Sequence, residues 1–200
     1  MPLRLPVKVH NPRELSARGE AALVVDGAHF QRIVRDGILR AAVSIDIMTA
    51  DFKAMLVPGG LGTLGTSRRR APSIVEIFRQ RARRGVEIRL LHAGVPSSAA
   101  LRELSGQIPR GLTIRRCPRL HAKTVVIDCR AMYLGSANLT GAGLGAKNDH
   151  RRNFEAGLLL TEPASIARLM DQIDSLWLGR FCPKCQRRDV CPDPLDARDA

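Results

Sequence analysis

The stretch His121–Asn138 reads HAKTVVIDCRAMYLGSAN, and the spacing of its polar residues indicates both a fold and a chemistry. His121 and Lys123 are two residues apart, so on a β-strand their side chains project from the same face. An imidazole and an ammonium group on one face can converge on a single phosphate, which suits phosphoryl chemistry. A histidine and a lysine alone would usually be incidental on a strand. This stretch, however, continues with Asp128, Ser136 and Asn138.

Segments on both sides of this stretch alternate between two hydrophobic periods. Apolar residues with the period or composition of strands predict β-structure at 21–25, 42–48, 86–92, 112–115, 121–128, 131–136 and 153–160. Helical spacing predicts helices at 29–41, 73–84, 97–104 and 163–177. Strands that alternate with helices favour an α/β fold, with a mixed β-sheet flanked by helices.

The length of 200 residues is enough for one domain with a substantial core. Residues 1–20 are polar and aperiodic, and they read as an N-terminal arm. Residues 21–178 contain the predicted strands and helices, and 179–200 form a cysteine-containing C-terminal tail. No stretch reaches the apolar length of a membrane-spanning helix, so a soluble, cytoplasmic protein is expected.

The pattern of histidine, lysine, aspartate, Gly-Ser and asparagine in His121–Asn138 resembles the signature motif of the phospholipase D superfamily. The flanks are also similar to that family: RRGVEIR at 83–89 precedes the motif, and NFE at 153–155 follows it. The resemblance extends over roughly residues 21–177, and it implies the phospholipase D-like fold.

The resemblance implies a metal-independent phosphodiesterase with no cofactor for catalysis. His121 would be the nucleophile that forms a covalent phosphohistidine. Lys123 and Asn138 would bind the phosphate oxygens and stabilise their charge, a task that metal ions perform in other phosphoryl-transfer enzymes.

Three further residues take supporting roles in this comparison. Ser136 would bond the phosphate or support the nucleophile. Glu155 would accept a hydrogen bond from the second ring nitrogen of the histidine and fix its tautomer. Asp128 belongs to the motif, but its expected role is structural, at the turn that follows the strand.

The chain contains one His-x-Lys motif, whereas the mechanism of this family needs a second histidine to protonate the leaving oxygen. None of the remaining histidines is followed two residues later by lysine; they are His10, His29, His92 and His150. The resemblance therefore implies a homodimer in which two motifs face each other across a two-fold axis.

The formal net charge of +13 favours a polyanionic partner. Nucleic acid, most simply DNA, is the expected substrate, bound through its phosphates with little sequence specificity. Among members of the family, small single-motif nucleases look similar, including those of bacterial defence or restriction systems, which would add other subunits as partners. The alternatives are a phospholipase D or phosphatidyltransferase acting on anionic phospholipid, and a non-catalytic nucleic-acid-binding subunit.

Basic residues near the motifs are candidates for substrate binding, and a Gly-rich basic loop at 57–71 is expected to lie beside the substrate groove. An Arg-rich composition with solvated charges, and a surface insertion in place of that loop, are the plainer alternatives. The candidates are Arg68, Arg69, Arg70, Arg119, Lys147, Arg151 and Arg152.

Three cysteines crowd the end of the chain with the spacing C-x2-C-x5-C, namely Cys182, Cys185 and Cys191. Three thiolates at this spacing can reach one ion. The expected role is a structural zinc site or an iron–sulfur cluster, and a reduced, metal-free tail is the alternative. The fourth ligand would be Cys117, Cys129 or His150.

Overall fold

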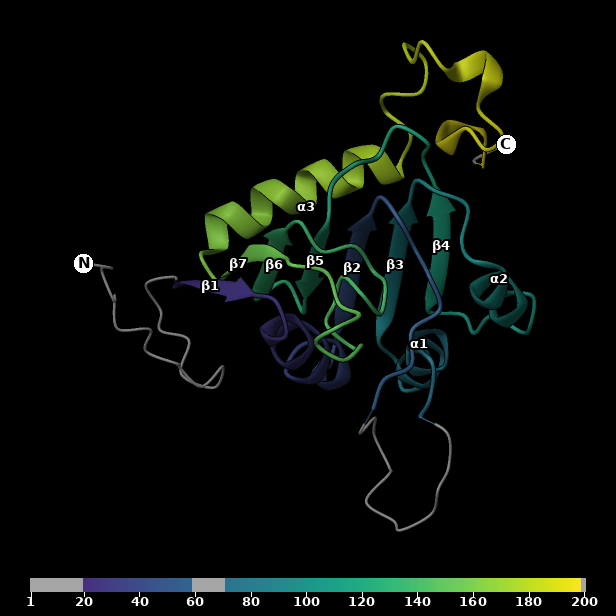
Figure 1. The fold of residues 1–200 in the computed structure, drawn as a ribbon. Coiled ribbons are helices and arrows are strands. Elements are labelled where there is room, and N and C mark those ends of the chain that lie inside the picture. Colours follow the sequence, from purple (N-terminus) through teal and green to yellow (C-terminus); the bar gives the residue numbers. More distant parts are fainter. Residues whose placement is uncertain (1–19, 59–70, 199–200) are drawn as a thin grey trace.

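A seven-stranded mixed sheet forms the centre of the molecule, which is seen here as a computed structural model that describes residues 20–58 and 71–198 (Figure 1). The strand order is β1-β7-β6-β5-β2-β3-β4. The parallel strands are β2 (Ser44–Thr49), β3 (Glu87–His92) and β4 (Leu112–Arg116). The antiparallel part contains β5 (Thr124–Ile127), β6 (Ala131–Gly135), β7 (Ala156–Leu160) and β1 (Ala21–Val25).

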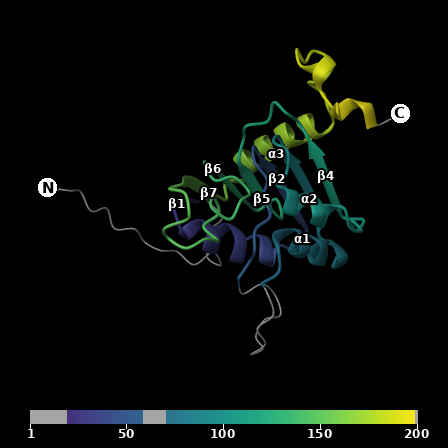
Figure 2. The same cartoon turned by 45° about the vertical axis from the view of Figure 1, so that its right-hand side comes forward.

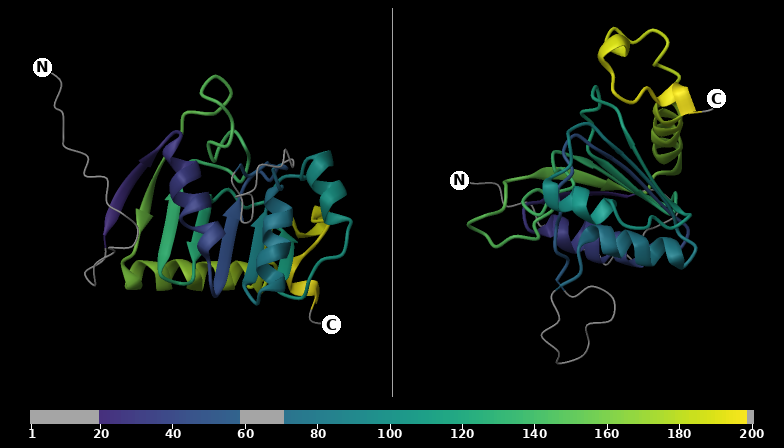
Figure 3. Two further views of the ribbon diagram at one scale, coloured as in Figure 1. Left: turned by 90° about the horizontal axis from the view of Figure 1, so that it is seen from below. Right: turned by 90° about the vertical axis from the view of Figure 1, so that its right-hand side faces the viewer.

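Helices cover both faces of this sheet, so the domain has three layers (Figure 3). One face packs against η2 (Phe30–Arg35), η3 (Ile38–Arg40) and α1 (Ile74–Arg83), with α2 (Ser98–Leu104) at the β4 side. The other face packs against α3 (Pro163–Trp177). This arrangement confirms the predicted α/β class, a mixed sheet between helices.

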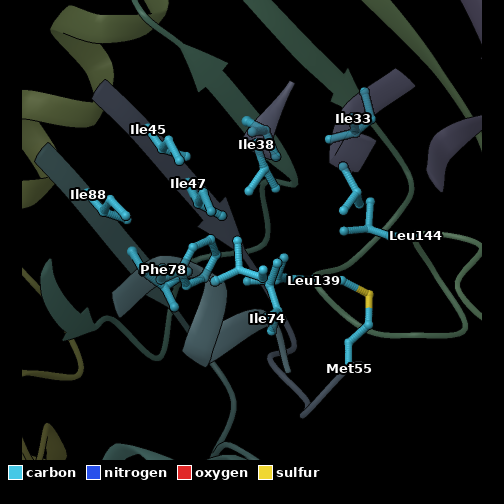
Figure 4. Close-up of a cluster of buried hydrophobic side chains, with 14 of the residues drawn as sticks. Ile33, Ile38, Ile45, Ile47, Met55, Ile74, Phe78, Ile88, Leu139 and Leu144 are labelled. Atoms are coloured by element: carbon cyan, nitrogen blue, oxygen red, sulfur yellow. The ribbon is translucent and has the colours of Figure 1, made fainter. Parts of the chain in front are cut away.

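The larger hydrophobic core lies between the sheet and the helices η2, η3 and α1 (Figure 4). Ile45 and Ile47 of β2 point into it because successive strand residues alternate between faces. Ile74 and Phe78 of α1 meet them, since residues four apart share one side of a helix. Ser73 caps this helix by accepting a hydrogen bond from the Glu76 amide at 3.1 Å.

A charge network, in which Asp46 is the buried member, joins α3 to the face of the sheet that it covers. Arg89 of β3 donates to Asp46 of β2 at 2.5 Å and to Asp174 of α3 at 2.7 Å. Asp46 is buried, and desolvation raises its pKa in spite of the bond from Arg89. The guanidinium groups of Arg89 and Arg115 both lie 5.6 Å from the ring centre of Trp177. These contacts fix the C-terminal half of α3 against β2, β3 and β4.

Three of the sequence-based expectations on secondary structure were wrong in detail, and one of them is the strand expected at 153–160, which begins only at Ala156. The segment 29–41 is not one helix, because it divides at Gly37 into the π-helical η2 and the short η3. A Cβ at Gly37 would lie 2.5 Å from the Ile33 carbonyl oxygen, so the chain approaches itself closely there. The strand expected at 121–128 is limited to Thr124–Ile127, which leaves His121 and Lys123 in the loop before it. The expected arm at 1–20 lies outside the described residues except for Glu20.

Candidate active site

His121 and Lys123 lie together in the loop that leads from β4 into β5. The Lys123 Nζ atom is 3.4 Å from each ring nitrogen of His121 and donates to the His121 carbonyl oxygen at 2.8 Å. The imidazole is exposed, while the lysine is half-buried. The pair therefore places an imidazole ring and an ammonium group close together at the surface, although the two residues are not part of a regular strand.

Ser136 and Glu155 form a second polar group where β6 ends and β7 begins. The Ser136 hydroxyl donates to one carboxylate oxygen of Glu155 and accepts from the Ala156 amide at 3.1 Å. The other carboxylate oxygen accepts from the Asn153 side chain at 3.0 Å. The Glu155 amide in turn donates to the Asp26 carboxylate at 3.0 Å. These bonds hold the Glu155 carboxylate in a fixed orientation.

The structure gives Glu155 partners that differ from the one implied by the family resemblance. Within the described part of the chain, Glu155 and His121 share no hydrogen bond, and Ser136 and Asn153 occupy the carboxylate oxygens instead. A carboxylate has lone pairs left for a further donor, so this arrangement does not occupy all of its accepting capacity.

Asn138 is anchored by its side-chain oxygen. That oxygen accepts from the Asp51 amide at 3.0 Å and from the Thr49 hydroxyl at 3.3 Å. Because an amide N–H can only donate, the bond from Asp51 fixes which end of the Asn138 side chain is oxygen. The NH₂ group is then at the other end of the side chain, where it is a hydrogen-bond donor.

Asp128 lies at the opposite end of β5 from His121 and Lys123. Its carboxylate accepts from the backbone amides of Ala42, Val43 and Ser44 at 2.7 to 3.1 Å. Its backbone has a φ of 52°, which aspartate tolerates better than most residues. The aspartate of the motif thus ties the turn after β5 to the segment that enters β2, and it does not reach the catalytic candidates.

Two adjoining cavities share His121. A polar cleft of about 710 Å³ is lined by 118–121 and by Lys184, Gln186 and Arg187 of the tail. A more apolar cavity of about 380 Å³ lies between the same loop, α3 and the tail, with Leu120, Leu176 and Phe181 among its walls. His121 therefore stands at the boundary between a polar and an apolar surface.

The basic candidates from the sequence lie in three different places. Arg119 lines both cavities that contain His121. Lys147, Arg151 and Arg152 belong to the loop between β6 and β7 and line neither cavity; Arg152 pairs with Asp149 at 2.9 Å. Arg68, Arg69, Arg70 and most of the basic loop lie outside the described residues.

Residues of the tail were missed by the sequence-based list of substrate contacts. Lys184 and Arg187 line the cleft beside His121, yet they lie 63 and 66 positions further along the chain. Their charge was visible in the sequence, but the tail lies outside the segment that resembles the family. Only the tertiary contacts place it next to the motif.

Four of the cysteines line one small cavity of about 70 Å³, and they are Cys117, Cys182, Cys185 and Cys191. Of the three candidates for a fourth ligand, Cys117 alone shares this cavity, whereas Cys129 and His150 lie on exposed loops elsewhere. Across residues 20–58 and 71–198, no three His, Cys, Asp or Glu side chains are gathered so as to hold a metal ion. Metal binding by this cluster stays a prediction.

Cys185 accepts hydrogen bonds that stabilise its thiolate form. Hydrogen bonds from the Arg187 backbone and from the Arg119 side chain lower the pKa of Cys185. The Arg119 Nη1 atom is 3.3 Å from the sulfur. This contact connects the tail to the loop that carries His121.

The fold and the site define a phospholipase D-like domain. Residues 34–177 match the family model described as "Cardiolipin synthase, PLD-like domain", and the chain belongs to the phospholipase D superfamily. Within the described residues, no helix combines the length and apolar character needed to cross a membrane.

Solved structures with the same fold agree with this assignment. The chain is similar to Nuc from Salmonella typhimurium, with 18% identity, a TM-score of 0.57, and 80% of this chain and 94% of that chain covered. It is also similar to NucT from Helicobacter pylori, with 16% identity, a TM-score of 0.53, and coverage of 78% and 94%. The archaeal chromatin protein TrmBL2 matches at 11% identity and a TM-score of 0.51, with coverage of 86% and 55%. No match was found among curated protein sequences.

Proposed function

We propose that this protein is a metal-independent phosphodiesterase that cleaves nucleic acid through a phosphohistidine on His121. The observation that carries the proposal is the position of the Lys123 Nζ atom, 3.4 Å from both ring nitrogens of an exposed histidine that faces a polar cleft. In this position the ammonium group can neutralise a phosphate oxygen while the imidazole attacks the same phosphorus.

The proposed reaction has two displacements at phosphorus, and the first forms the phosphohistidine. A ring nitrogen of His121 attacks phosphorus, so an N–P bond forms while the bond to the leaving oxygen breaks. Lys123 and the NH₂ group of Asn138 bind the non-bridging oxygens, on which charge accumulates. The leaving oxygen takes a proton from a general acid, which is the partner subunit's His121.

The second step returns the enzyme to its starting state. Water attacks the phosphohistidine, so an O–P bond forms and the N–P bond breaks. The proton that water loses passes to the partner subunit's His121, which is protonated again. Because one histidine must be neutral and the other protonated, the dependence of rate on pH is expected to be bell-shaped.

The histidines of a single described chain support the requirement for a second copy. His29 is fully buried and bonded to the Tyr133 hydroxyl at 3.0 Å. His92 is 5% exposed, bonds the Gly94 carbonyl oxygen, and has a pKa lowered by burial. His150 lines neither cavity that contains His121, and His10 lies outside the described residues. A general acid from a partner subunit fills this role.

An exposed apolar patch supplies a surface for this partner. Leu23, Leu158 and Leu134 lie side by side on β1, β7 and β6, and each is more than 40% exposed. They lie on the α3 face of the sheet, since Met132 and Leu160, two residues away on the same strands, belong to the core under α3. Phe154, which precedes Glu155 in the chain just before β7, is 92% exposed.

A patch of this kind is unusual on a soluble monomer, because exposed apolar area is normally scattered. Its position next to Ser136 and Glu155 is consistent with a second copy of the chain as its occupant. Two copies that pair through this patch by a two-fold axis would bring their catalytic groups toward each other.

Nucleic acid is the proposed substrate because of charge. The net charge of +13 and the polar, basic cleft at His121 favour a phosphate polymer over an isolated ester. Phospholipid is the second candidate, and the cavity of about 380 Å³ with apolar walls beside His121 favours it, since it could accept an apolar group attached to the diester.

One experiment separates these substrates. The purified chain is incubated in excess EDTA with single-stranded DNA, double-stranded DNA, RNA and a fluorescent phospholipid. Cleavage of a nucleic acid without cleavage of the lipid is the expected result. Cleavage of the lipid alone would favour the second candidate, and activity that needs added Mg²⁺ or Mn²⁺ would overturn the mechanism.

A further inference from the structure

The tail that follows α3 extends beyond the end of the sheet (Figure 2), and contacts of its far part attach it to the domain. Leu195 is buried in the core under α3. Arg115 of β4 donates to the carbonyl oxygens of Trp177 and Leu195, and it thereby connects the end of α3 to the tail. Arg188 pairs with Asp196 at 2.6 Å within the tail. These contacts give residues 179–196 a defined position.

That position brings two basic side chains to the catalytic histidine. Lys184 and Arg187 are exposed, and they line the cleft of about 710 Å³ together with Arg119 and His121. The Arg187 Nη1 atom lies 3.5 Å from the Pro118 carbonyl oxygen, so its side chain reaches toward the loop of His121. Among the described residues that line the cleft, none is acidic.

We propose that the tail forms one wall of the active site, in which Lys184 and Arg187 bind backbone phosphates that flank the cleaved phosphodiester. Arg119, on the loop that carries His121, lines the same cleft, so three cations line it in all, while Lys123 lies next to the His121 ring. Lys123 neutralises the phosphate under attack, which leaves the other cations for its neighbours in the polymer. The inference rests on the proposed function, and it names the part of the substrate that the tail recognises.

The chemistry of the wall favours a phosphate polymer. A guanidinium group binds phosphate through two parallel N–H bonds, and an ammonium group binds it as a point charge. A simple phospholipid diester presents one phosphate, whereas a nucleic acid presents a neighbour on each side. A wall of cations beyond the attacked phosphate therefore improves binding only for the polymer.

The test compares two double variants that remove the same charge. Lys184→Ala/Arg187→Ala removes the wall, and Arg168→Ala/Arg180→Ala removes two exposed arginines that do not line the cleft. Each full-length variant is assayed for binding of a fluorescent single-stranded oligonucleotide by anisotropy across a range of salt concentrations. Hydrolysis of the same oligonucleotide and of bis(4-nitrophenyl) phosphate is measured in EDTA, and folding is checked by circular dichroism.

The wall variant is expected to bind the oligonucleotide at least tenfold more weakly than the control. Its plot of log affinity against log salt should be shallower by roughly 1.4, because each lost phosphate contact on a single strand contributes about 0.7. Hydrolysis of the small diester should change less than twofold.

Equal binding by the wall and control variants would overturn the inference and leave the proposed function intact. Binding that depends on the wall without any hydrolysis by the wild type would support the inference and remove the proposed activity. A wild-type chain that does not bind the oligonucleotide would overturn both the nucleic-acid substrate and the wall.

Discussion

In the proposed mechanism, Asn138 is a phosphate-binding residue whose side chain is already held in place by the fold. Its oxygen is held by the Asp51 amide and the Thr49 hydroxyl, and Thr49 also accepts from the Leu139 amide at 3.0 Å. Thr49 is buried at the end of β2, so the anchor is rigid. A donor fixed in advance stabilises developing charge without reorganisation at the moment of reaction.

The contacts of Asp128 are structural, so its loss is expected to change stability more than activity. Asp128→Ala removes the acceptor for three backbone amides and is expected to lower the free energy of unfolding by about 1 to 3 kcal/mol. The kcat measured well below the melting temperature should be nearly unchanged. Urea unfolding and steady-state kinetics check the two parts. A large loss of kcat in a variant of normal stability would show a direct role in the reaction.

The sequence could identify the catalytic candidates but not their surroundings. The spacing of His121 and Lys123 predicted a convergent pair, and the pair converges, although in a loop rather than on a strand. The anchor of Asn138 comes from β2, nearly 90 residues earlier in the chain. No local pattern reports a contact of that range, so only the fold reveals it.

Among the helices, the ends were predicted well where the sequence carries capping residues. Helix α3 begins at Pro163 and ends at Trp177 as expected, because Glu162 caps it and proline is favoured in the first turn. The segment 29–41 has similar apolar spacing, but the close approach of the chain at Gly37 divides it. Tertiary packing decided that case, and the periodicity alone could not show it.

The charge network that joins α3 to the sheet predicts how stability changes when Arg89 is replaced. Arg89→Ala leaves Asp46 buried without its cation and is expected to cost about 3 to 5 kcal/mol at pH 7. Burial already raises the pKa of Asp46, and loss of Arg89 should raise it further. When the pKa of a carboxyl group is higher in the folded state than in the unfolded state, the protein becomes less stable as the pH rises. For Asp46 this loss begins as the pH rises above the ordinary pKa of the group, 3.8.

The destabilisation in Arg89→Ala should therefore be smaller near pH 4 than at pH 7. Chemical unfolding at both pH values checks this, with Arg83→Ala on the exposed side of α1 as the matched control. A loss of stability that does not depend on pH, or one equal to that of the control, would contradict the assignment of a buried ion pair.

The cysteines around the small cavity predict a metal site that attaches the tail to the domain. We expect about one zinc ion per chain, bound by Cys117, Cys182, Cys185 and Cys191 as a closed structural site. The side chains are not gathered for an ion as they stand, so the metal would have to draw the sulfur atoms together.

Elemental analysis of protein purified without chelator checks this metal. Cys185→Ser should lower both the zinc content and the melting temperature, whereas Cys129→Ser, on the exposed β5–β6 turn, should change neither. A brown protein would indicate an iron–sulfur cluster instead. Metal-free wild-type protein with an unchanged melting temperature in Cys185→Ser would contradict a metal site.

For the whole molecule, the proposed mechanism requires two copies of the chain, because the second copy supplies the general acid. Leu158→Asp places a charge in the centre of the apolar patch and is expected to give a monomer with strongly reduced activity. Val95→Asp is the control, because Val95 is 65% exposed and lies outside the patch. Light scattering and hydrolysis in EDTA check the two variants together. A fully active Leu158→Asp monomer would show that one chain supplies both the nucleophile and the acid.

The proposed mechanism depends on a covalent bond between His121 and phosphorus that forms without a metal ion. The most direct measurement is the mass of the chain denatured in alkali during turnover of a short oligonucleotide in excess EDTA, since a phosphohistidine survives alkali. The expected result is a nucleotidyl adduct on His121 that is absent in His121→Ala. Turnover in EDTA with an adduct on another residue, or unchanged turnover by His121→Ala, would contradict it.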